Sequence, residues 1–491
     1  MRAGYVGIDV GTSAVKVLIQ DDAGRAIAKA SRAYPTMSPQ PGWSEQSPRD
    51  WWNATAETLR EAISLADATI LSVGLSGQLN GFLLVGKDGE PIAPAPIWLD
   101  LRAEAEAKEI AAAADFTVLT GNELSPICVL PKLAWFRRHR PELLDGAARI
   151  LLVKDWILFQ LTREIATDPS DAASTAMTTP NGLAWDAALL RLAGVNQDLL
   201  PMIRPSVSIG GRVTKDAAIL TGLPAGAPVA VGVGDVTALA VGCGVVGPGR
   251  VAITLGTAGH VVAQATRQGH VTGLGLWRIP HAIQGSTLLL GLIMSGGLSL
   301  AWLRRILGHE QEQPSFDAME RLAKNSPVGS RGVTFLPFLE GVATPHRRPD
   351  ARGAFLGLSS SHVAGDMVRA VMEGVAFNAV ECIRALEVAG TEISEIRIAE
   401  GGAQSPLWCS IMAAAIGVPV TLVAERDTSA AGAALVGRAA HEGGNLTDVA
   451  ERSCVVADRY DVPADRSNIL AACHVYTEQA ARLLQSSIKE S

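Results

Sequence analysis

The sequence lacks several features that define large classes of protein. Lysine and arginine form no cluster, and the formal charge of −7 argues against a nucleic-acid partner. The longest apolar run begins at Thr287, is too short to span a bilayer, and is interrupted by Gly296 and Gly297. No basic and apolar leader precedes the first strand-like segment. We therefore expect neither a nucleic-acid partner nor a membrane location.

Cysteine and aromatic residues are also scarce. The six cysteines are far apart and form no C-x-x-C pair, which is typical of reduced, mostly buried thiols in a cytoplasmic protein. Hydrophobic residues make up 48% of the chain and charged residues 19%, as in ordinary globular proteins. A chain of 491 residues is too long for a single hydrophobic core and predicts roughly two to four domains.

A glycine-rich turn lies between two apolar strands at the start of the chain. Residues 6–10 and 15–19 have the composition of buried strands, and residues 11–13 between them predict a tight hairpin. Residues 250–265 repeat this pattern about half a chain later. A repeat at this distance indicates a duplicated domain rather than a short-period solenoid, with a boundary in the turn-rich residues 244–249.

Strand and helix patterns alternate along the rest of the chain. Residues 68–77 have the composition of a strand, and residues 103–114 that of a solvated amphipathic helix. This alternation predicts an α/β fold whose sheets are covered by helices. We expect two domains, formed by residues 1–246 and 247–491.

Both glycine-rich turns have what a polyphosphate site needs. Glycines let the backbone approach an anion, consecutive N–H groups form an anion nest, and threonine hydroxyls add donors. The pair of turns predicts ATP binding, with Mg²⁺ at Asp9. The expected phosphate-binding residues are Gly11, Thr12, Ser13, Lys16, Gly256 and Thr257. The alternative is that both are simple hairpins, and no P-loop motif occurs.

Asp235 follows the strand pattern of residues 228–235 and precedes the helical pattern of residues 235–246. The simplest interpretation of an aspartate at this position is a helix N-cap. Its place at the end of an apolar strand, near the expected domain boundary, favours a catalytic role, because α/β sheets bind ligands at their strand ends. A carboxylate there can accept the proton of an attacking hydroxyl during phosphoryl transfer to an alcohol.

Several segments together resemble the FGGY family of carbohydrate kinases and, within it, most closely the xylulokinases. The segments are GIDVGTSAVK, GWSEQSPRDWW, GVGDVTALAVG, TLGTAG, TPHRRPDARGAFLGL and GGAQSPLW. The resemblance covers nearly the whole chain. It implies two ribonuclease-H-like domains, as in actin, sugar kinases and chaperone ATPases, with a cleft between them. It also implies a general base at Asp235, a homodimer, and further nucleotide contacts at Gly297, Gly402 and Ala403.

Sugar recognition is expected on two polar segments, residues 76–81 and 98–102. A sugar needs several convergent donors and acceptors and a modest apolar face. Together with Asp235, the side chains expected to bind the substrate are Gln78, Leu79, Asn80, Asp100 and Arg102. An alternative for Asp100 and Arg102 is a local ion pair, and both interpretations can hold at once.

The chain departs from the family pattern at three places. Xylulokinases usually have Met-His where this chain has Leu79-Asn80, which leaves the identity of the sugar open. The family's Glu-Arg pair before Thr-Pro is replaced by Val342-Ala343, and its glycine triplet begins here with Glu400.

The sequence thus predicts an ATP-dependent kinase for a ketopentose, with D-xylulose as the first choice. Other pentuloses such as ribulose, and polyols of the glycerol or erythritol type, are alternative substrates. Two further classes stay open: an actin- or chaperone-type ATPase without a small substrate, and a sugar-binding relative without catalytic activity.

Overall fold

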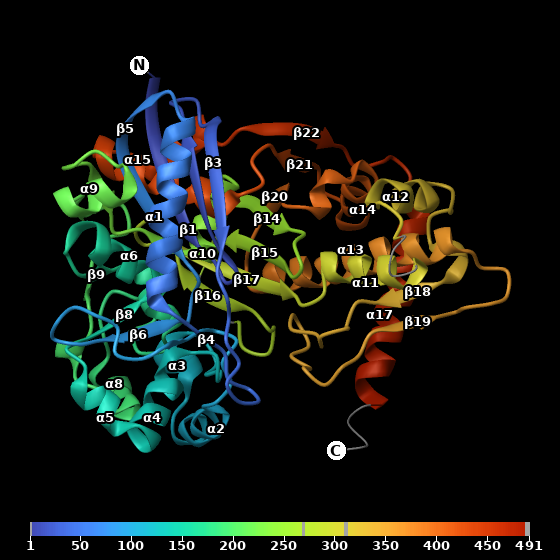
Figure 1. Ribbon diagram of the computed structural model, residues 1–491. Helices are drawn as coiled ribbons and strands as arrows, with labels where there is room; N and C mark the ends of the chain where they lie inside the picture. Colours follow the sequence, from blue (N-terminus) through green and yellow to red (C-terminus); the bar gives the residue numbers. More distant parts are fainter. Residues whose placement is uncertain (1, 268–270, 309–312, 487–491) are drawn as a thin grey trace. The chain divides into compact units, whose positions relative to one another are not determined.

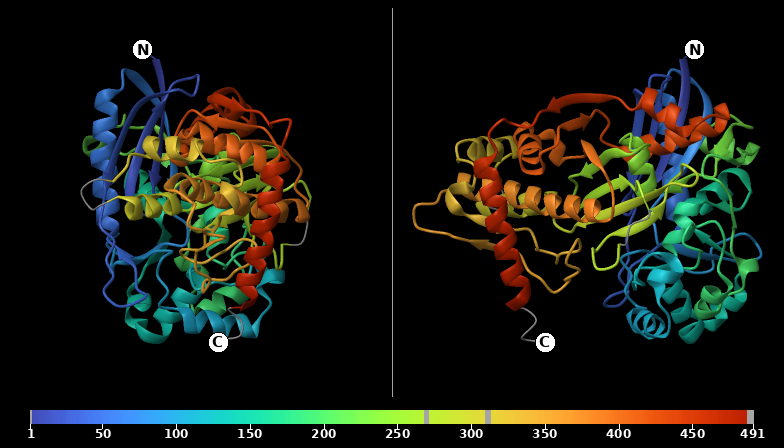
Figure 2. Two further views of the ribbon diagram at one scale, coloured as in Figure 1. Left: turned by 90° about the vertical axis from the view of Figure 1, so that its right-hand side faces the viewer. Right: turned by 180° about the vertical axis from the view of Figure 1, so that it is seen from behind.

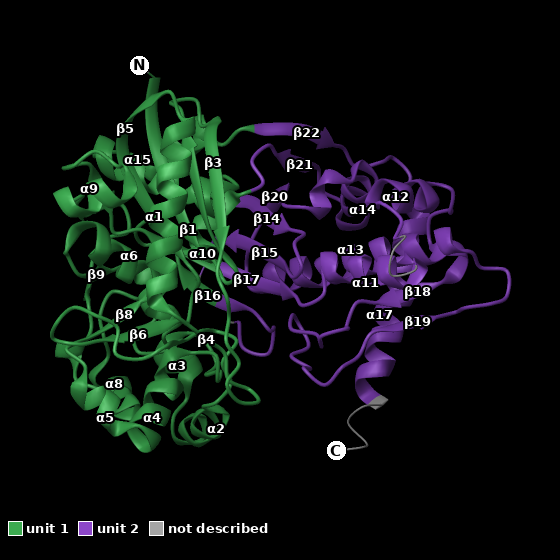
Figure 3. Cartoon of the chain, viewed as in Figure 1, with its two compact units in different colours: residues 1–246, 278–288, 427–455 green, residues 247–277, 289–426, 456–491 purple. Residues whose placement is uncertain are grey.

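The computed structural model describes residues 2–267, 271–308 and 313–486 (Figure 1). The chain forms two compact units (Figure 3). Unit 1 consists of residues 1–246, 278–288 and 427–455, and unit 2 of residues 247–277, 289–426 and 456–491. Segments 278–288 and 427–455 come from the half of the chain that the sequence assigns to the second domain.

A seven-stranded sheet forms the centre of unit 1, in the order β11, β12, β5, β1, β2, β3, with β13 paired to β5. As predicted, β1 (Arg2–Val10) and β2 (Ala14–Gln20) form an antiparallel hairpin, which places Asp9 opposite Lys16. β5 (Ala68–Gly77) runs parallel to β1 and places Ser76 opposite Asp9. The other strands are β3 (Ala26–Ala33), β11 (Ile209–Arg212), β12 (Pro228–Ala230) and β13 (Val233–Gly234).

Helices cover both faces of this sheet. Val6 and Ile8 of β1 belong to a core that also contains residues of α1 (Pro48–Leu65) and α6 (Val153–Thr162). Gly7 faces the opposite side, because successive residues of a strand alternate between the two faces. On that side α15 (Thr428–Glu442) packs against β1 and β5, and α10 (Asp235–Gly242) packs against α15.

The contact between α15 and the sheet requires glycine on both strands. A Cβ on Gly7 would lie 1.9 Å from the carbonyl oxygen of Ala430, and one on Gly74 would lie 1.8 Å from that of Ala433. No side chain fits at such distances, so the helix backbone lies directly on the strands. This contact fixes the start of α15, and with it Asp427, relative to β1.

The rest of unit 1 consists of short elements between and after the sheet strands. They are β4 (Glu45–Gln46), β6 (Phe82–Val85), β7 (Ala95–Pro96), α2 (Glu104–Ala113), α3 (Phe116–Thr120), α4 (Val129–His139), α5 (Pro141–Gly146), β8 (Arg149–Leu152), β9 (Ala166–Thr167), α7 (Pro169–Ser174), α8 (Ala187–Ala193), β10 (Met202–Ile203), α9 (Lys215–Thr221) and α16 (Leu446–Ser453). The helix predicted for residues 103–114 is α2.

Unit 2 repeats the strand arrangement of unit 1. β14 (Gly249–Thr254) and β15 (Gly259–Gln264) form the second predicted hairpin. β20 (Ile393–Ala399) runs parallel to β14, and β21 (Val420–Val423) runs parallel to β20, as β5 and β12 do beside β1. The shared topology agrees with the duplication inferred from the sequence. β17 (Thr287–Ile293) and β22 (Val456–Tyr460) extend this sheet, and β16 is Trp277–Pro280.

A long helix, α13 (Ala364–Val388), forms the core of unit 2. Most of its residues are buried, because α12, α14 and the β18 strand pack around it. α17 contacts α13 and α14, and its full length can be followed in Figure 2. The other elements are α11 (Gly297–Leu307), α12 (Phe316–Lys324), β18 (Thr334–Leu336), β19 (Ala354–Leu356), α14 (Pro406–Ile416) and α17 (Ser467–Ser486).

Two local predictions were wrong. Residues 228–235 form two short strands rather than one, because the chain turns at Gly232, whose φ is 87° and whose missing Cβ would lie 2.5 Å from the carbonyl oxygen of Leu75. The helix predicted for residues 235–246 already ends at Gly242, and Gly244 then adopts a left-handed conformation.

The six cysteines are thiols without a disulfide bond, and all but Cys454 are buried, as predicted. Among the described helices, none has both the length and the apolar character needed to span a membrane.

Candidate active site

Asp9 lies near the end of β1 and is almost completely buried, with 8% of its surface exposed. Its Oδ1 accepts a hydrogen bond of 2.8 Å from the Ser76 hydroxyl on β5. Burial raises the pKa of the Asp9 carboxyl, against the opposing effects of the Ser76 hydrogen bond and the charge of Lys16. The nearby Asp427 carboxylate raises this pKa further.

Lys16 pairs with a carboxylate that the sequence analysis missed. Its Nζ lies 2.9 Å from Oδ1 of Asp427, and Lys29 Nζ lies 3.7 Å from Oδ2 of the same residue. The Lys16 side chain is 47% exposed, and exposed ion pairs of this kind contribute only about 0–1 kcal/mol. A phosphate group can therefore replace this contact at small cost. The available signal was an aspartate directly before a helix rich in alanine and glycine.

The first glycine-rich turn is held by side chains from later segments. The Gly11 N–H donates to the carbonyl of Ala14 across the turn. Gln46 Nε2 donates to the carbonyl of Thr12 (2.6 Å), and Trp98 Nε1 donates to the Thr12 hydroxyl (2.8 Å). Ser13 accepts a backbone hydrogen bond through its carbonyl oxygen. These hydrogen bonds hold the turn in a defined conformation.

Asp235 is the first residue of α10, and the N-cap is Gly234, so the simple N-cap interpretation was wrong. Desolvation raises the pKa of the Asp235 carboxyl to about 7, and the Asp9 carboxylate adds to this shift. The N–H groups of Val236 and Leu79 oppose it through hydrogen bonds. A base whose pKa lies near neutrality is suited to accept a proton at physiological pH. Asp9, Leu79 and Asp235 therefore lie close together in unit 1.

Two buried acceptors lie on either side of Leu79, whose N–H binds Asp235, in the predicted sugar segment. Gln78 donates through Nε2 to Gln46 Oε1 (2.9 Å). Within the described part of the chain, neither Oε1 of Gln78 nor Oδ1 of Asn80 has a hydrogen-bond partner. A buried acceptor without a partner destabilises a fold by about 1–3 kcal/mol, so these atoms indicate a place for ligand hydroxyls.

Lys132, which the sequence analysis also missed, holds this segment in place. Its Nζ donates to the carbonyl oxygens of Asn80 (3.0 Å) and Ile97 (2.6 Å). Burial lowers the pKa of the amine to about 7, although the Asp100 carboxylate opposes the shift. The only sequence signal was a single lysine in the apolar stretch VLPKLAWF of α4.

Asp100 and Arg102 form the local ion pair that was one of the two interpretations. Arg102 Nη2 lies 2.7 Å from Asp100 Oδ2 and 2.6 Å from Glu45 Oε1, and both members of the pair are buried. The guanidinium also lies 3.7 Å from the centre of the Trp43 ring. The Asp100 carboxylate further accepts the Ser44 N–H. These contacts fix the conformation of residues 98–102. Direct contact of Asp100 or Arg102 with a sugar stays a prediction.

A buried charged cluster lies next to Asp235. Lys154 Nζ is 2.6, 3.3 and 3.4 Å from carboxylate oxygens of Asp155, Asp168 and Asp171, respectively. The Ser170 hydroxyl donates to Asp168 (2.6 Å) and accepts the N–H of Gly234 (2.9 Å), the residue before Asp235. The cluster therefore fixes the backbone at the start of α10. Its residues lie in none of the motifs that the sequence shows.

In unit 2, the predicted nucleotide-binding residues also meet. The N–H groups of Gly297 and Leu298, at the start of α11, donate to the carbonyls of Gly256 (2.6 Å) and Thr257 (3.1 Å). The Gly402 N–H donates to the carbonyl of Leu255 (2.9 Å). Ala403, the remaining predicted residue, is buried directly after Gly402. These contacts bring the second glycine-rich turn and the expected adenosine segment together.

The residues of unit 1 suit a magnesium ion that is bound together with a nucleotide. The described residues contain no group of three or more side chains able to enclose a metal. Mg²⁺ in such sites keeps several waters and uses one or two carboxylates plus substrate phosphates. Asp9 fits this role, because burial and Asp427 raise the pKa of its carboxyl, and a bound cation would add to Lys16 in stabilising the ionised form.

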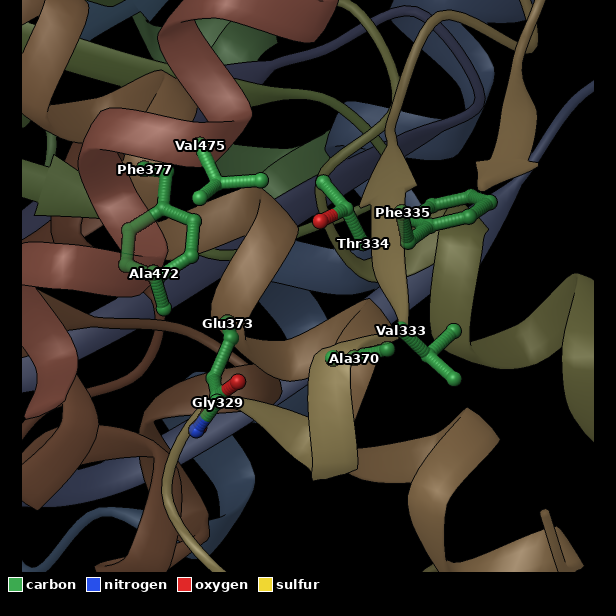
Figure 4. A pocket seen from close by; sticks show the side chains of 10 residues that line it. Gly329, Val333, Thr334, Phe335, Ala370, Glu373, Phe377, Ala472 and Val475 are labelled. Atoms are coloured by element: carbon green, nitrogen blue, oxygen red, sulfur yellow. The ribbon is translucent and has the colours of Figure 1, made fainter. Parts of the chain in front are cut away.

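A separate pocket in unit 2 offers less for chemistry (Figure 4). Its lining is mostly apolar, and Glu373 is its charged lining residue. The Glu373 carboxylate already accepts hydrogen bonds from Arg369, the Gly329 N–H and the Ser330 hydroxyl. The candidate site residues therefore remain those predicted at the glycine-rich turns, and this pocket adds none to them.

Comparison with known proteins agrees with this geometry. The chain matches the N-terminal domain of the FGGY family of carbohydrate kinases over residues 4–242 and the C-terminal domain over residues 251–441. It is 30% identical to a xylulose kinase of Staphylococcus epidermidis over 88% of this chain and 86% of that protein. It is 33% identical to a glycerol kinase of Gloeobacter violaceus over 87% of this chain and 86% of that protein.

A solved structure shows the same fold. The crystal structure of xylulose kinase from Rhodospirillum rubrum superposes on this chain with a TM-score of 0.89. The alignment covers 98% of this chain and 99% of that protein, and the two sequences are 29% identical. The fold is therefore the two-domain α/β fold of sugar kinases that the motifs predicted. On these grounds the chain belongs to the FGGY family of carbohydrate kinases, phosphotransferases that act on an alcohol group.

Proposed function

We propose that this kinase transfers the γ-phosphoryl group of ATP to a hydroxyl of D-xylulose, with Mg²⁺ as cofactor. The observation that carries the proposal is the grouping in unit 1 of Asp235, whose pKa is about 7, with the acceptors of Gln78 and Asn80 that have no partner. A base and several sugar-binding groups in one place are what an alcohol kinase needs, and an ATPase without a small substrate does not need them.

In the proposed reaction, Asp235 accepts the proton of the substrate hydroxyl as its oxygen attacks the γ-phosphorus. The new oxygen–phosphorus bond forms while the bond to the leaving ADP breaks. Backbone N–H groups of Thr12, Gly256 and Thr257 hold the phosphate oxygens, while Gly11, whose N–H is bonded to Ala14, leaves room for the phosphate to approach the backbone. The ammonium group of Lys16 leaves Asp427 and pairs with a phosphate oxygen. Mg²⁺ at Asp9 would neutralise charge on these oxygens. Such a transition state depends on positioning and electrostatics more than on covalent catalysis.

The sugar hydroxyls are proposed to donate to Gln78 Oε1 and Asn80 Oδ1, the two buried acceptors. Leu79 supplies an apolar contact beside Asp235. Asp100 and Arg102 then act chiefly by fixing the segment, because their charged groups already bind each other, Glu45 and Ser44. Gly297, Gly402 and Ala403 are the proposed adenosine contacts.

A polyol is the second candidate substrate. It is favoured by the similarity to a glycerol kinase and by Asn80, which stands where xylulokinases usually have histidine. An amide and an imidazole differ in reach and in their hydrogen-bonding geometry, so this position affects which hydroxyl pattern fits.

An assay of ADP release over D-xylulose, D-ribulose, glycerol, erythritol and gluconate tests the proposal. We expect the highest kcat/KM with D-xylulose, by at least about tenfold, since a mismatched hydrogen-bond pattern leaves buried groups unpaired. A higher kcat/KM with glycerol would replace xylulose by the polyol. ATP hydrolysis that no sugar stimulates would instead support the ATPase class.

We further propose that the kinase is a cytoplasmic homodimer. Light scattering coupled to size-exclusion chromatography measures the assembly, and a mass of one chain would contradict the dimer.

A further inference from the structure

Glu400 has a backbone conformation that glycine adopts more readily. Its φ is 70°, in the left-handed region, where Cβ approaches the following carbonyl oxygen. It follows the last residue of β20 and precedes Gly401 and Gly402. Local structure therefore favours glycine at this position and does not explain a glutamate. Strained residues of this kind occur preferentially at functional sites.

The Glu400 side chain reaches the second glycine-rich turn. A Cβ built on Gly256 would lie 2.3 Å from Oε2 of Glu400, so the carboxylate occupies the space beside the Gly256 Cα. The opposite side of this turn is fixed, because the Gly256 carbonyl accepts the N–H of Gly297 at 2.6 Å. The carboxylate thus lies against the backbone that is proposed to bind phosphate.

A carboxylate at this position affects an anionic ligand directly. Two like charges a few ångströms apart repel each other by several RT even at the high effective dielectric of a partly exposed site. Glu400 is partly exposed, so its charge is only partly screened. Metal-free nucleotide brings its full negative charge to the turn, whereas a nucleotide complexed with a divalent cation brings less.

We propose that Glu400 is a specificity-determining residue that makes nucleotide binding at the second turn depend on a divalent cation. The inference rests on the proposed use of this turn for phosphate. Its carboxylate disfavours metal-free nucleotide and tolerates the cation complex. The simpler competing role is mechanical, with the side chain only supporting the turn at Gly256.

Equilibrium binding of ADP to the full chain, measured by calorimetry in EDTA and in Mg²⁺, separates these roles. For Glu400→Gln, which keeps the size of the side chain, we expect the Kd of metal-free ADP to fall by about tenfold, because the repulsion is removed. We expect the Kd of Mg²⁺-ADP to change by less than about threefold, since the cation already screens the carboxylate. Equal changes under both conditions, or no change, would overturn the proposal.

Two further variants complete the experiment. Glu392→Gln removes the same charge just before the opposite end of β20, where the side chain is exposed, and should leave both Kd values unchanged. Glu400→Gly also relieves the backbone strain and should show the same tighter binding of metal-free ADP as Glu400→Gln, with Mg²⁺-ADP little changed; weaker binding of both forms would show a mechanical role and overturn the proposal. Wild-type protein that binds neither form would overturn the proposed function itself.

Discussion

The Ser76 hydroxyl donates a hydrogen bond of 2.8 Å to Oδ1 of Asp9, residues that lie opposite each other on the parallel strands β5 and β1. The hydrogen bond favours the ionised carboxylate, whereas burial opposes it. The register of β1 and β5 therefore places Ser76 where its hydroxyl stabilises the ionised Asp9 carboxylate, which is proposed to bind Mg²⁺.

Removing this hydrogen bond should weaken the binding of Mg²⁺ at Asp9. Hydrogen bonds to charged groups contribute about 1.5–3 kcal/mol, so we expect Ser76→Ala to raise the Mg²⁺ concentration needed for half-maximal rate by roughly tenfold. Asp9→Asn should have a larger effect, because it removes the charge. Initial rates as a function of Mg²⁺ concentration measure both. An unchanged Mg²⁺ dependence in Asp9→Asn would contradict the assignment.

The pH dependence of the reaction should report Asp235. A general base acts in its deprotonated form, so kcat/KM should fall tenfold per pH unit below the Asp235 pKa of about 7 and level off above it. Asp235→Asn should lower kcat by about 10²–10⁴-fold and abolish this break, while the Kd for ATP stays similar. A break that persists in this variant would assign the titration to another group.

Replacing Lys132 should weaken binding of the sugar and leave binding of the nucleotide nearly unchanged. Lys132→Met keeps most of the apolar stem and removes the donor to the carbonyls of Asn80 and Ile97. We expect KM for the sugar to rise by about tenfold, with a small change in kcat and in KM for ATP, because two buried carbonyls lose a donor. Lys108→Met, at an exposed site on α2, is the matched control.

The close contact between α15 and the sheet predicts a loss of stability in Gly74→Ala. The new Cβ would lie 1.8 Å from the Ala433 carbonyl oxygen, so the helix must move away. Overpacking of this kind typically lowers the free energy of unfolding by about 1–3 kcal/mol. Gly247→Ala, where a Cβ meets no atom within 4 Å, is the control. Equal urea midpoints for both variants would contradict the prediction.

Sequence patterns predicted the parts of the site that depend on local structure. Both hairpins, with Gly11 and Gly256 in their turns, follow from short apolar runs around glycine, so they could be predicted. Lys132 and Asp427 could not, because their partners, Asn80 and Lys16, are far away in the sequence and only the tertiary fold brings them together. The turn at Gly232 was missed because the apolar run continues through it, and the position is set by contact with Leu75.

The packing of α15 against the β-sheet of unit 1 also constrains how the protein folds during synthesis. β1 and β5 leave the ribosome early, yet the glycines that they present have no partner until residues 427–455 have been made. Until then α15 does not cover this face of the sheet, and the backbone at Gly7 and Gly74 is exposed. The order of translation and the order of assembly therefore differ, because unit 1 can be completed only after residues 427–455 have been made.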